Sequence, residues 1–188
     1  MTASLPAATP GRTPATEADL FARFDALGIK HVTHRHAPVF TVAESADIKA
    51  NLPGGHSKNL FLKDKKGRLF LLCALGDTKI DLNAVAKLVG AAGRFTFCNA
   101  ELLMQHLGVT PGSVTLFALI NDPDRNVTLL LDEGFVGHDP VNFHPLSNDA
   151  TTAISPDDLL KFIQSLGREP IRLAFDADGA PSRIEPGA

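Results

Sequence analysis

The sequence contains no tryptophan and no tyrosine, so 12 phenylalanines make up its whole count of Phe, Trp and Tyr. A platform on which the bases of single-stranded nucleic acid stack is built from aromatic rings. Here such a platform would rest on phenylalanine alone. This argues against an RNA-binding protein that works mainly by stacking.

Cysteine is scarce as well. The two cysteines, Cys73 and Cys98, each lie in an apolar stretch, and neither belongs to a CxxC motif. Free cysteines in such stretches are usually buried, and so few thiols do not form the disulfide scaffold of a small secreted protein. We therefore expect buried thiols and no disulfide framework.

Features that mark several common protein classes are also missing. No apolar run is long enough to span a bilayer, and the N-terminus lacks the pattern of a signal peptide, so we expect a cytoplasmic protein without a membrane partner. Walker A, GxGxxG and GxSxG motifs are absent. His34 and His36 would share one side of a strand, but no further ligands follow at a suitable spacing. We predict neither a metal nor a cofactor.

Length and composition indicate one globular domain. The chain has 188 residues, of which 44% are hydrophobic and 21% charged. Residues 1–15 are rich in alanine, proline and threonine, and residues 178–188 look similar, so both are predicted to be disordered tails around a domain at 16–177. The formal net charge of −3 argues against a protein that coats nucleic acid or binds DNA.

Local signals predict helices and short strands in mixed order. Helices are expected after good N-cap residues: Thr16, Thr41, Asp81, Asn99 and Ser155. Strands are expected at 29–33, 58–63, 68–75, 94–98, 113–120, 127–131 and 171–175, with one or two more in 141–154. Turns at 64–67 and 121–124 join two pairs as hairpins, which excludes a purely parallel sheet. The sequence predicts an α+β fold with a mixed, mostly antiparallel sheet flanked by helices.

Lys58 is placed unusually for a cation. Alternate residues of a strand share a face, so Lys58 lines up with Leu60 and Leu62, next to the glycine-bearing loop 51–56. One interpretation is that Lys58 lies at the strand end and extends its ammonium to water. The other is that it lies at the mouth of an apolar pocket and holds an anion such as a phosphate. The pattern leaves both open.

The segment Gly108-Val109-Thr110-Pro111-Gly112-Ser113 joins a predicted helix to a predicted strand. With two glycines and one proline, it can present backbone N–H groups that no secondary structure uses, and such groups can hold a carbonyl oxygen or its oxyanion. It can equally be a plain turn with Gly108 as the helix C-cap.

Residues 142–152 are dense in hydrogen-bonding side chains and include His144. They could line a polar pocket or form an irregular surface loop stabilised by Asn and Asp side chains.

Basic residues gather in one part of this acidic protein. Residues 47–68 contain six cations against two carboxylates: Lys49, Lys58, Lys63, Lys65, Lys66 and Arg68 against Asp47 and Asp64. A solvated hairpin tip would explain the pattern, and so would a landing surface for a nucleic-acid backbone.

Four segments, in this order, carry a resemblance to a known family. They are Arg35-His36-Ala37-Pro38-Val39-Phe40-Thr41, Pro53-Gly54-Gly55-His56-Ser57-Lys58-Asn59-Leu60-Phe61-Leu62, Leu107-Gly108-Val109-Thr110-Pro111-Gly112-Ser113-Val114, and Asp139-Pro140-Val141-Asn142-Phe143-His144-Pro145. The chain resembles the YbaK/prolyl-tRNA-synthetase editing-domain family, from about Asp19 to Phe175. Within it, the chain is most similar to the stand-alone deacylases that clear alanine from proline tRNA.

The resemblance implies roles for individual residues. Lys58 matches the key lysine of the family, which engages the 3′ end of the tRNA through its phosphate or terminal ribose. The glycine loop contacts the aminoacyl ester through backbone groups, so Gly108 and Gly112 join Lys58 as expected catalytic positions. The segment around His144 helps to set the pocket size. The expected substrate-binding residues are Phe40, Asn59, Leu60, Val109, Thr110, Pro111, Ser113 and His144.

The expected activity is hydrolysis of Ala-tRNA(Pro), with the tRNA(Pro) acceptor end as partner and prolyl-tRNA synthetase as a second candidate partner. An aminoacyl ester is activated, so neither a metal nor a Ser-His-Asp triad is obligatory. Two alternatives stay open: a deacylase for Cys-tRNA(Pro) or of broader specificity, and a tRNA- or synthetase-binding module without catalysis.

Overall fold

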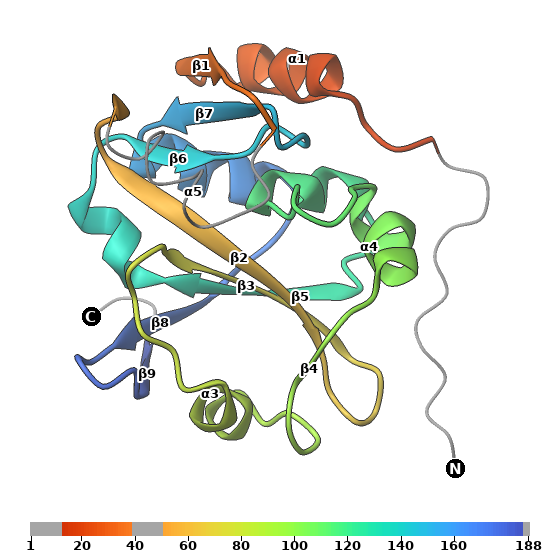
Figure 1. Cartoon of the computed structure of the whole chain (residues 1–188), viewed down its shortest axis with the longest axis vertical. Coiled ribbons are helices and arrows are strands. Elements are labelled where there is room, and N and C mark those ends of the chain that lie inside the picture. The colour runs from red at the N-terminus through yellow and green to blue at the C-terminus, as the bar shows by residue number, and fades with distance from the viewer. Residues whose placement is uncertain (1–12, 39–50, 186–188) are drawn as a thin grey trace.

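The computed structural model describes residues 13–38 and 51–185 (Figure 1). The helices are α1 (Glu17–Leu27), α3 (Leu82–Leu88), α4 (Ala100–Leu107) and α5 (Pro156–Ser165), with the short 3-10 helices η1 (Leu116–Asn121) and η2 (Glu133–Gly137). The strands are β1 (His31–Arg35), β2 (Gly55–Lys63), β3 (Leu69–Leu75), β4 (Thr96–Phe97), β5 (Val127–Asp132), β6 (Val141–Phe143), β7 (Ala150–Ile154), β8 (Ile171–Phe175) and β9 (Pro181–Ile184). The helix predicted after Thr41 lies outside the described residues.

The predicted helix caps are confirmed for the described helices. At α1, the Thr16 hydroxyl accepts from Asp19 N–H at 3.2 Å, and the Asp19 carboxylate accepts from Thr16 N–H at 2.8 Å, so both halves of a capping box are present. Asp81, Asn99 and Ser155 likewise accept N–H bonds from the first turns of α3, α4 and α5. Each helix therefore begins where its local sequence satisfies the free N–H groups of the first turn.

The strands form one mixed sheet in the order β1-β7-β6-β2-β3-β5-β8-β9, and β4 adds to β2 away from this path. The β2–β6, β3–β5 and β5–β8 pairs are parallel, and the remaining described pairs are antiparallel. This confirms the predicted α+β class with a mixed, mostly antiparallel sheet. β2 is the long strand that crosses the middle of the molecule in Figure 1.

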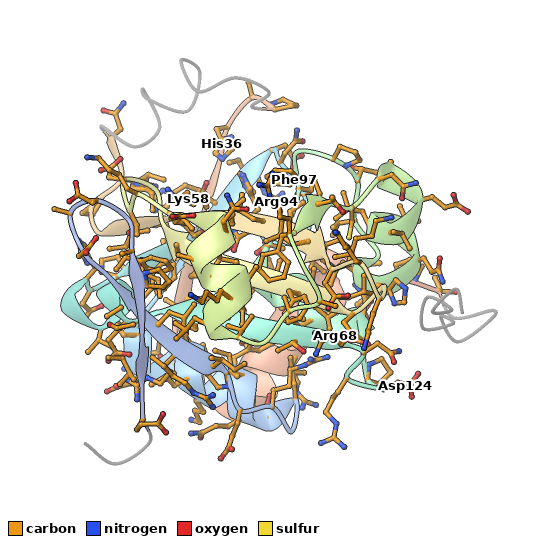
Figure 2. All side chains as sticks on the ribbon, turned by 90° about the horizontal axis from the view of Figure 1, so that it is seen from below. His36, Lys58, Arg68, Arg94, Phe97 and Asp124 are labelled. Carbon is orange, nitrogen blue, oxygen red and sulfur yellow. The ribbon has the colours of Figure 1, made fainter. Side chains whose placement is uncertain are left out.

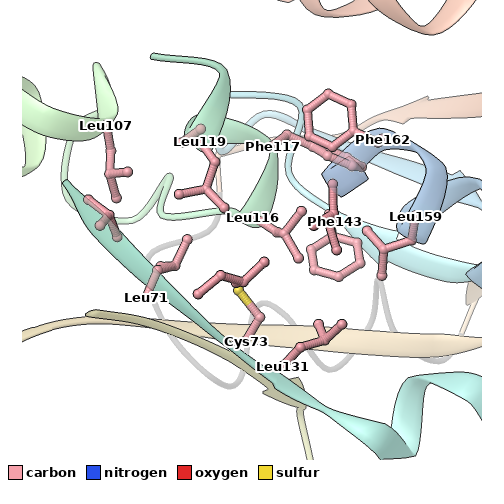
Figure 3. Close-up of a cluster of buried hydrophobic side chains, with 14 of the residues drawn as sticks. Leu71, Cys73, Leu107, Leu116, Phe117, Leu119, Leu131, Phe143, Leu159 and Phe162 are labelled. Carbon is pink, nitrogen blue, oxygen red and sulfur yellow. The ribbon is translucent and has the colours of Figure 1, made fainter. Parts of the chain in front are cut away.

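Each face of the central strands packs against its own hydrophobic core. Phe61 of β2 and Cys73 of β3 belong to the larger core, which contains residues of η1 and α5 (Figure 3). Leu62 and Phe70 belong to a smaller core, which also contains Val85 of α3. Because side chains alternate along a strand, one strand supplies both cores.

Both cysteines are free thiols. Cys73 is fully buried, and desolvation raises its pKa well above the ordinary value. Cys98 is half-buried, and desolvation raises its pKa to about 11 against the opposing charge of Lys63. Neither thiol is suited to act as a nucleophile at neutral pH, since the thiolate is the reactive form.

The second predicted hairpin is wrong. Residues 116–121 form η1, and β5 pairs in parallel with β3 instead of returning on a neighbour. The run from Leu116 to Leu119 is buried on all sides, and periodicity does not separate a buried strand from a buried helix in so short an apolar run. Thr115, whose hydroxyl accepts from Phe117 N–H at 3.3 Å, caps the helical turn.

The C-terminal prediction also differs from the structure. Residues 181–184, expected in a tail, form β9 antiparallel to β8. Asp176 builds the turn between them, since its carboxylate accepts from Asp178 N–H at 3.0 Å and from Ala180 N–H at 2.9 Å. Gly179 supplies the left-handed residue of this turn, with a φ of +90°.

Candidate functional site

One edge of β2 is open in the middle of the strand. β3 pairs along the whole opposite edge from Ser57 to Lys63. On the open side, β6 reaches only as far as His56 and β4 begins only at Leu62. Within the described parts of the chain, the stretch between these two contacts has no strand partner.

The direction of the backbone groups in this open stretch follows from the bonds at its ends. Phe61 O accepts from Cys98 N–H at 3.0 Å on the open side, whereas His56 O accepts from Gly76 N–H at 2.7 Å on the β3 side. Backbone groups alternate between the two edges of a strand. The Ser57 N–H faces the same side as Phe61 O but is used by the ladder to Asn142 of β6, so the C=O of Ser57 and the N–H and C=O of Asn59 are the groups that face the open edge, where a ligand can approach them.

Lys58 points to the face of β2 that carries α3. It shares a side of β2 with Leu60 and Leu62, which pack in the smaller core. Its Nζ donates to the carbonyl oxygen of Gly76 at 3.2 Å and to that of Thr78. The ammonium is thus held by protein oxygen atoms of the turn that follows β3, rather than extended into bulk water.

Asn59 points to the opposite face. Its amide donates to the Ser57 hydroxyl at 3.1 Å, but its carbonyl oxygen Oδ1 is buried and accepts no hydrogen bond in the described structure. An unpaired buried acceptor costs about 1–3 kcal/mol. Asn59 Oδ1 is therefore a group that a donor on a bound ligand would satisfy.

Gly108 has a structural task in the glycine loop. It ends α4 with a φ of +63°, and its N–H donates to Met104 O at 3.1 Å. A Cβ here would lie 2.7 Å from Asn121 Nδ2 and 2.8 Å from Pro14 Cβ. Protein atoms therefore cover Gly108, and the sequence did not reveal this packing.

Gly112 is more open. It is exposed, has a φ of +90°, and a Cβ there would meet only Asn148 Nδ2, at 3.4 Å. Ser113 N–H donates to Thr110 O at 3.0 Å and closes a turn, while among the described residues the N–H groups of Thr110 and Gly112 find no protein acceptor. Of the six loop residues, Thr110, Pro111 and Gly112 are exposed, and Val109 and Ser113 are buried.

His144 and His36 form the next part of the site. His144 Nδ1 donates to Ala150 O at 2.9 Å, His36 Nε2 bonds the Thr151 hydroxyl at 2.9 Å, and the two ring centroids lie 6.3 Å apart. Burial lowers the pKa of His144, the bond to Ala150 opposes the shift, and the charge of His36 adds to it. The His144 imidazole is therefore neutral at neutral pH.

The structure brings some predicted residues together and separates others. The loop after His144 lies beside the glycine loop, since a Cβ at Gly112 would lie 3.4 Å from Asn148 Nδ2. Lys58 comes from the α3 face (Figure 2), whereas Val109 packs in the core on the other face. Lys58 and Val109 therefore lie on opposite faces of the sheet. Phe40 lies outside the described residues.

Sequence reasoning missed several residues of this region. His36 was considered as half of a metal pair and as part of the first segment of the resemblance, and Asn148 only as one of the polar residues of 142–152. No pattern indicated the turn that holds Lys58. In the described ranges, no group of three or more His, Cys, Asp or Glu side chains is placed to bind a metal ion. No helix in the described part combines the length and apolar character of a membrane span.

Comparison with known proteins identifies the family. The model of the aminoacyl-tRNA editing domain matches residues 36–162, which include the open edge of β2, the glycine loop and His144. The chain belongs to the aminoacyl-tRNA editing domain family, which confirms the resemblance seen in the sequence.

Two relatives of this chain have names that refer to prolyl-tRNA or its synthetase. Over 158 residues the chain is 42% identical to prolyl-tRNA synthetase associated domain-containing protein 1 of Bos taurus, which covers 82% of this chain and 92% of that protein. It is also 34% identical over 149 residues to the prolyl-tRNA editing protein ProX of Acetoanaerobium sticklandii, covering 79% and 90% of the two chains.

Solved structures share the fold at low sequence identity. The hypothetical protein APE2540 superposes with a TM-score of 0.63 at 21% identity, covering 79% of this chain and 95% of that one. A structure described as a candidate trans-editing enzyme for prolyl-tRNA synthetase gives a TM-score of 0.60 at 22% identity, covering 83% and 95%.

Proposed function

We propose that this protein is a free-standing deacylase that hydrolyses the ester of mischarged proline tRNA, with alanine as the amino acid removed. The observation that carries the proposal is the glycine loop: Thr110 and Gly112 are exposed, and within the described ranges their N–H groups find no protein acceptor. Membership of the editing family and the similarity to ProX supply the substrate class.

The proposed mechanism uses the backbone N–H groups of the glycine loop and the ammonium of Lys58. A water molecule adds to the ester carbonyl, assisted by the free ribose hydroxyl of the terminal nucleotide. The N–H groups of Thr110 and Gly112 stabilise the negative charge that develops on the carbonyl oxygen. The bond to the ribose oxygen then breaks, which releases the amino acid and the tRNA. Lys58 contributes by fixing the terminal nucleotide.

Selection of the amino acid rests on the size of the pocket. The buried segment around His144 would form the wall that larger side chains meet, and its neutral imidazole adds no charge there. A hydrophobic pocket separates side chains that differ by one methylene by only about 1–3 kcal/mol. Proline, being larger than alanine, is excluded by contact with this wall.

A surface beside β4 supports binding of the tRNA acceptor end. Lys63 pairs with Thr96 across the two strands, and Phe97 next to it is 63% exposed. Among the described phenylalanines, Phe97 alone is exposed. We define the β4 surface as Lys63, Lys65, Lys66, Arg94 and Phe97. It offers cations for phosphates and one ring on which a base can stack.

Arg68, a member of the predicted basic stretch, does not contribute to this surface. Arg68 donates to the buried Asp64 carboxylate at 2.7 Å and to Gly90 O at 2.6 Å, so its charge is compensated within the protein. Lys49 lies outside the described residues.

Deacylation of tRNA(Pro) charged separately with Ala, Cys, Ser and Pro tests the proposal. We expect the Ala ester to be lost fastest and the Pro ester to persist. Faster loss of the Cys ester would mean that cysteine, not alanine, is the amino acid removed. Equal loss of several esters would mean a deacylase of broader specificity. Binding of tRNA without hydrolysis of any ester would show a module without catalysis.

A Lys58→Ala variant tests the site itself. Because Lys58 orients the nucleotide, we expect kcat/KM for Ala-tRNA(Pro) to fall about 100-fold while circular dichroism stays unchanged. Lys161→Ala is the matched control, since Lys161 is an exposed lysine on α5. An unchanged rate for Lys58→Ala would remove this lysine from the site.

A further inference from the structure

The turn that follows β3 holds the ammonium of Lys58. In this turn, residues 75–78, Thr78 N–H donates back to Leu75 O at 3.1 Å. Gly76 and Thr78 present their carbonyl oxygens to Lys58 Nζ. The position of the Lys58 ammonium therefore depends on what holds this turn.

Asp132 holds the turn from the other side. It is the last residue of β5 and is 3% exposed. Its Oδ2 accepts from Leu75 N–H at 3.1 Å and from the Thr78 hydroxyl at 2.8 Å, and its Oδ1 accepts from Gly134 N–H at 2.9 Å. With both oxygens engaged, the carboxylate has a fixed orientation.

Gly134 allows this arrangement by its lack of a side chain. A Cβ at Gly134 would lie 2.9 Å from Leu75 Cδ1 and 3.1 Å from Asp132 Oδ1. A larger residue at this position would push the Asp132 carboxylate away from the 75–78 turn. The glycine therefore allows η2 to lie close to this turn.

Thr78 joins the two halves of the network. Its hydroxyl donates to Asp132, and its carbonyl oxygen accepts from Lys58. We propose that Asp132 is a positioning residue for Lys58: acting through Thr78 and Leu75, it fixes the 75–78 turn and so keeps the ammonium at the end of β3. The use of that ammonium in deacylation rests on the proposed function, but the contact network does not.

A lysine needs such a support because its side chain is flexible. Ordering it costs side-chain entropy, and a displacement of about 1 Å in a reacting group can cost about 100-fold in rate. The carbonyl oxygens of Gly76 and Thr78 order the Lys58 side chain before the substrate binds.

Conservative variants separate this role from general stability. Thr78→Val removes the hydroxyl donor, Thr78→Ser keeps it, and Asp132→Asn replaces one accepting oxygen by an amide. We expect kcat/KM for Ala-tRNA(Pro) to fall about 10- to 100-fold in Thr78→Val and Asp132→Asn, and Thr78→Ser to restore most of it. If Asp132→Asn does not fold, Thr78→Val decides the outcome, because it keeps the carboxylate.

Asp122→Asn is the matched control. Asp122 lies just before the other end of β5, is 4% exposed, and also accepts backbone N–H bonds, from Asn126 at 3.0 Å and Val127 at 2.8 Å. We expect this variant to lose stability but to keep kcat/KM once the folded fraction is taken into account. An equal loss of kcat/KM in both aspartate variants would overturn the proposal.

A double-mutant cycle shows whether the effect passes through Lys58. In a Lys58→Ala background, Thr78→Val should cause no further loss of kcat/KM, whereas its effect on the free energy of unfolding should persist. Additive losses of activity in the double variant would mean that Thr78 does not act through Lys58.

Chemical modification of Lys58 provides a readout that needs no activity. The rate at which an amine-reactive ester modifies Lys58, measured by mass spectrometry against Lys161 in the same sample, should rise several-fold in Thr78→Val and Asp132→Asn. The same rate as in the wild type would overturn the positioning role. A wild-type protein that fails to deacylate would instead refute the proposed function and leave this result standing.

Discussion

At the scale of single residues, the two catalytic glycines predicted from the sequence have different surroundings. Gly108 is enclosed by Asn121 and Pro14, whereas Gly112 is exposed beside Asn148. Both adopt positive φ angles, but only Gly112 has space in front of it for a substrate. The chemistry of the loop is therefore expected at its exposed end.

Gly112→Ala tests this assignment. The change forces an L-residue into the left-handed region, at about 1–2 kcal/mol, and shifts the N–H donors of the loop, so we expect kcat to fall about 10- to 100-fold. Gly90→Ala is the control, because Gly90 has a φ of +66° and nothing within 4 Å of its Cβ position. Equal rates in the two variants would contradict a contact between the loop and the ester.

His106 predicts how stability depends on pH. It is 2% exposed, its Nε2 has no hydrogen-bond partner in the described structure, and burial lowers its pKa against the opposing charge of Asp122. The unfolded chain therefore binds a proton more readily than the native protein, so the free energy of unfolding falls as pH drops below about 6.5.

Replacing this histidine removes one source of the acid sensitivity. His106→Leu should show a shallower loss of stability than the wild type between pH 7 and pH 5 in urea denaturation. Parallel curves would mean that His106 does not titrate differently in the two states. The pKa of His144 is lowered as well, so His144 also destabilises the native protein at low pH. The free energy of unfolding of His106→Leu should therefore still fall between pH 7 and pH 5, but less steeply.

At the scale of secondary-structure elements, the β2–β3 hairpin depends on one buried carboxylate. Asp64 is 4% exposed and accepts from Lys66 N–H, Arg68 N–H, Arg68 Nε and Ala92 N–H at 2.7–3.0 Å. Desolvation works against its charge, but these bonds outweigh it and lower the pKa of Asp64.

Asp64→Ala should therefore destabilise the protein by about 3 kcal/mol, because several buried donors lose their acceptor. Asp176→Ala gives the comparison, since Asp176 builds the β8–β9 turn in the same way but is exposed. We expect a clearly smaller loss there, measured by chemical denaturation. Equal losses of stability in the two variants would show that burial of the carboxylate does not determine how much it stabilises its turn.

At the scale of the whole molecule, the acidic protein carries a basic, aromatic β4 surface close to the open edge of β2. Phe97→Ala should weaken binding of tRNA(Pro), since one stacked base is worth about 1–3 kcal/mol. Lys63→Gln should reduce the magnitude of the slope of log K for tRNA(Pro) binding against log salt concentration by about one. Val136, which is 56% exposed on η2, provides Val136→Ala as the control, and the same affinity in all three variants would exclude the surface.

The parts of this fold that were predicted correctly are those set by neighbouring residues. Thr16 with Asp19 marks a helix start within four residues, and the β2–β3 hairpin closes over the short turn at Asp64. The parallel pairing of β5 with β3 and the contact of Asp132 with Thr78 join residues more than fifty positions apart. No local pattern specifies such contacts, so they were missed.

The same reasoning explains which part of the site was foreseen. Lys58 and Gly112 are visible because an ammonium in an apolar row and a glycine-rich link are unusual in themselves. The carbonyl ligands of Lys58 are backbone atoms of Gly76 and Thr78, and any residue could supply them. Asn148 and His36 belong to segments whose composition is common in surface loops.

The break in pairing along β2 also bears on solubility. An uncovered strand normally invites a second chain to add to it, which is how many proteins begin to aggregate. Here β6 and β4 stand at either end of the uncovered stretch, so an incoming strand would collide with them before it could pair. Under the proposed function, the group that binds there is a terminal nucleotide, which is much shorter than a strand, so the same gap in pairing that would accept it would exclude a second copy of the chain.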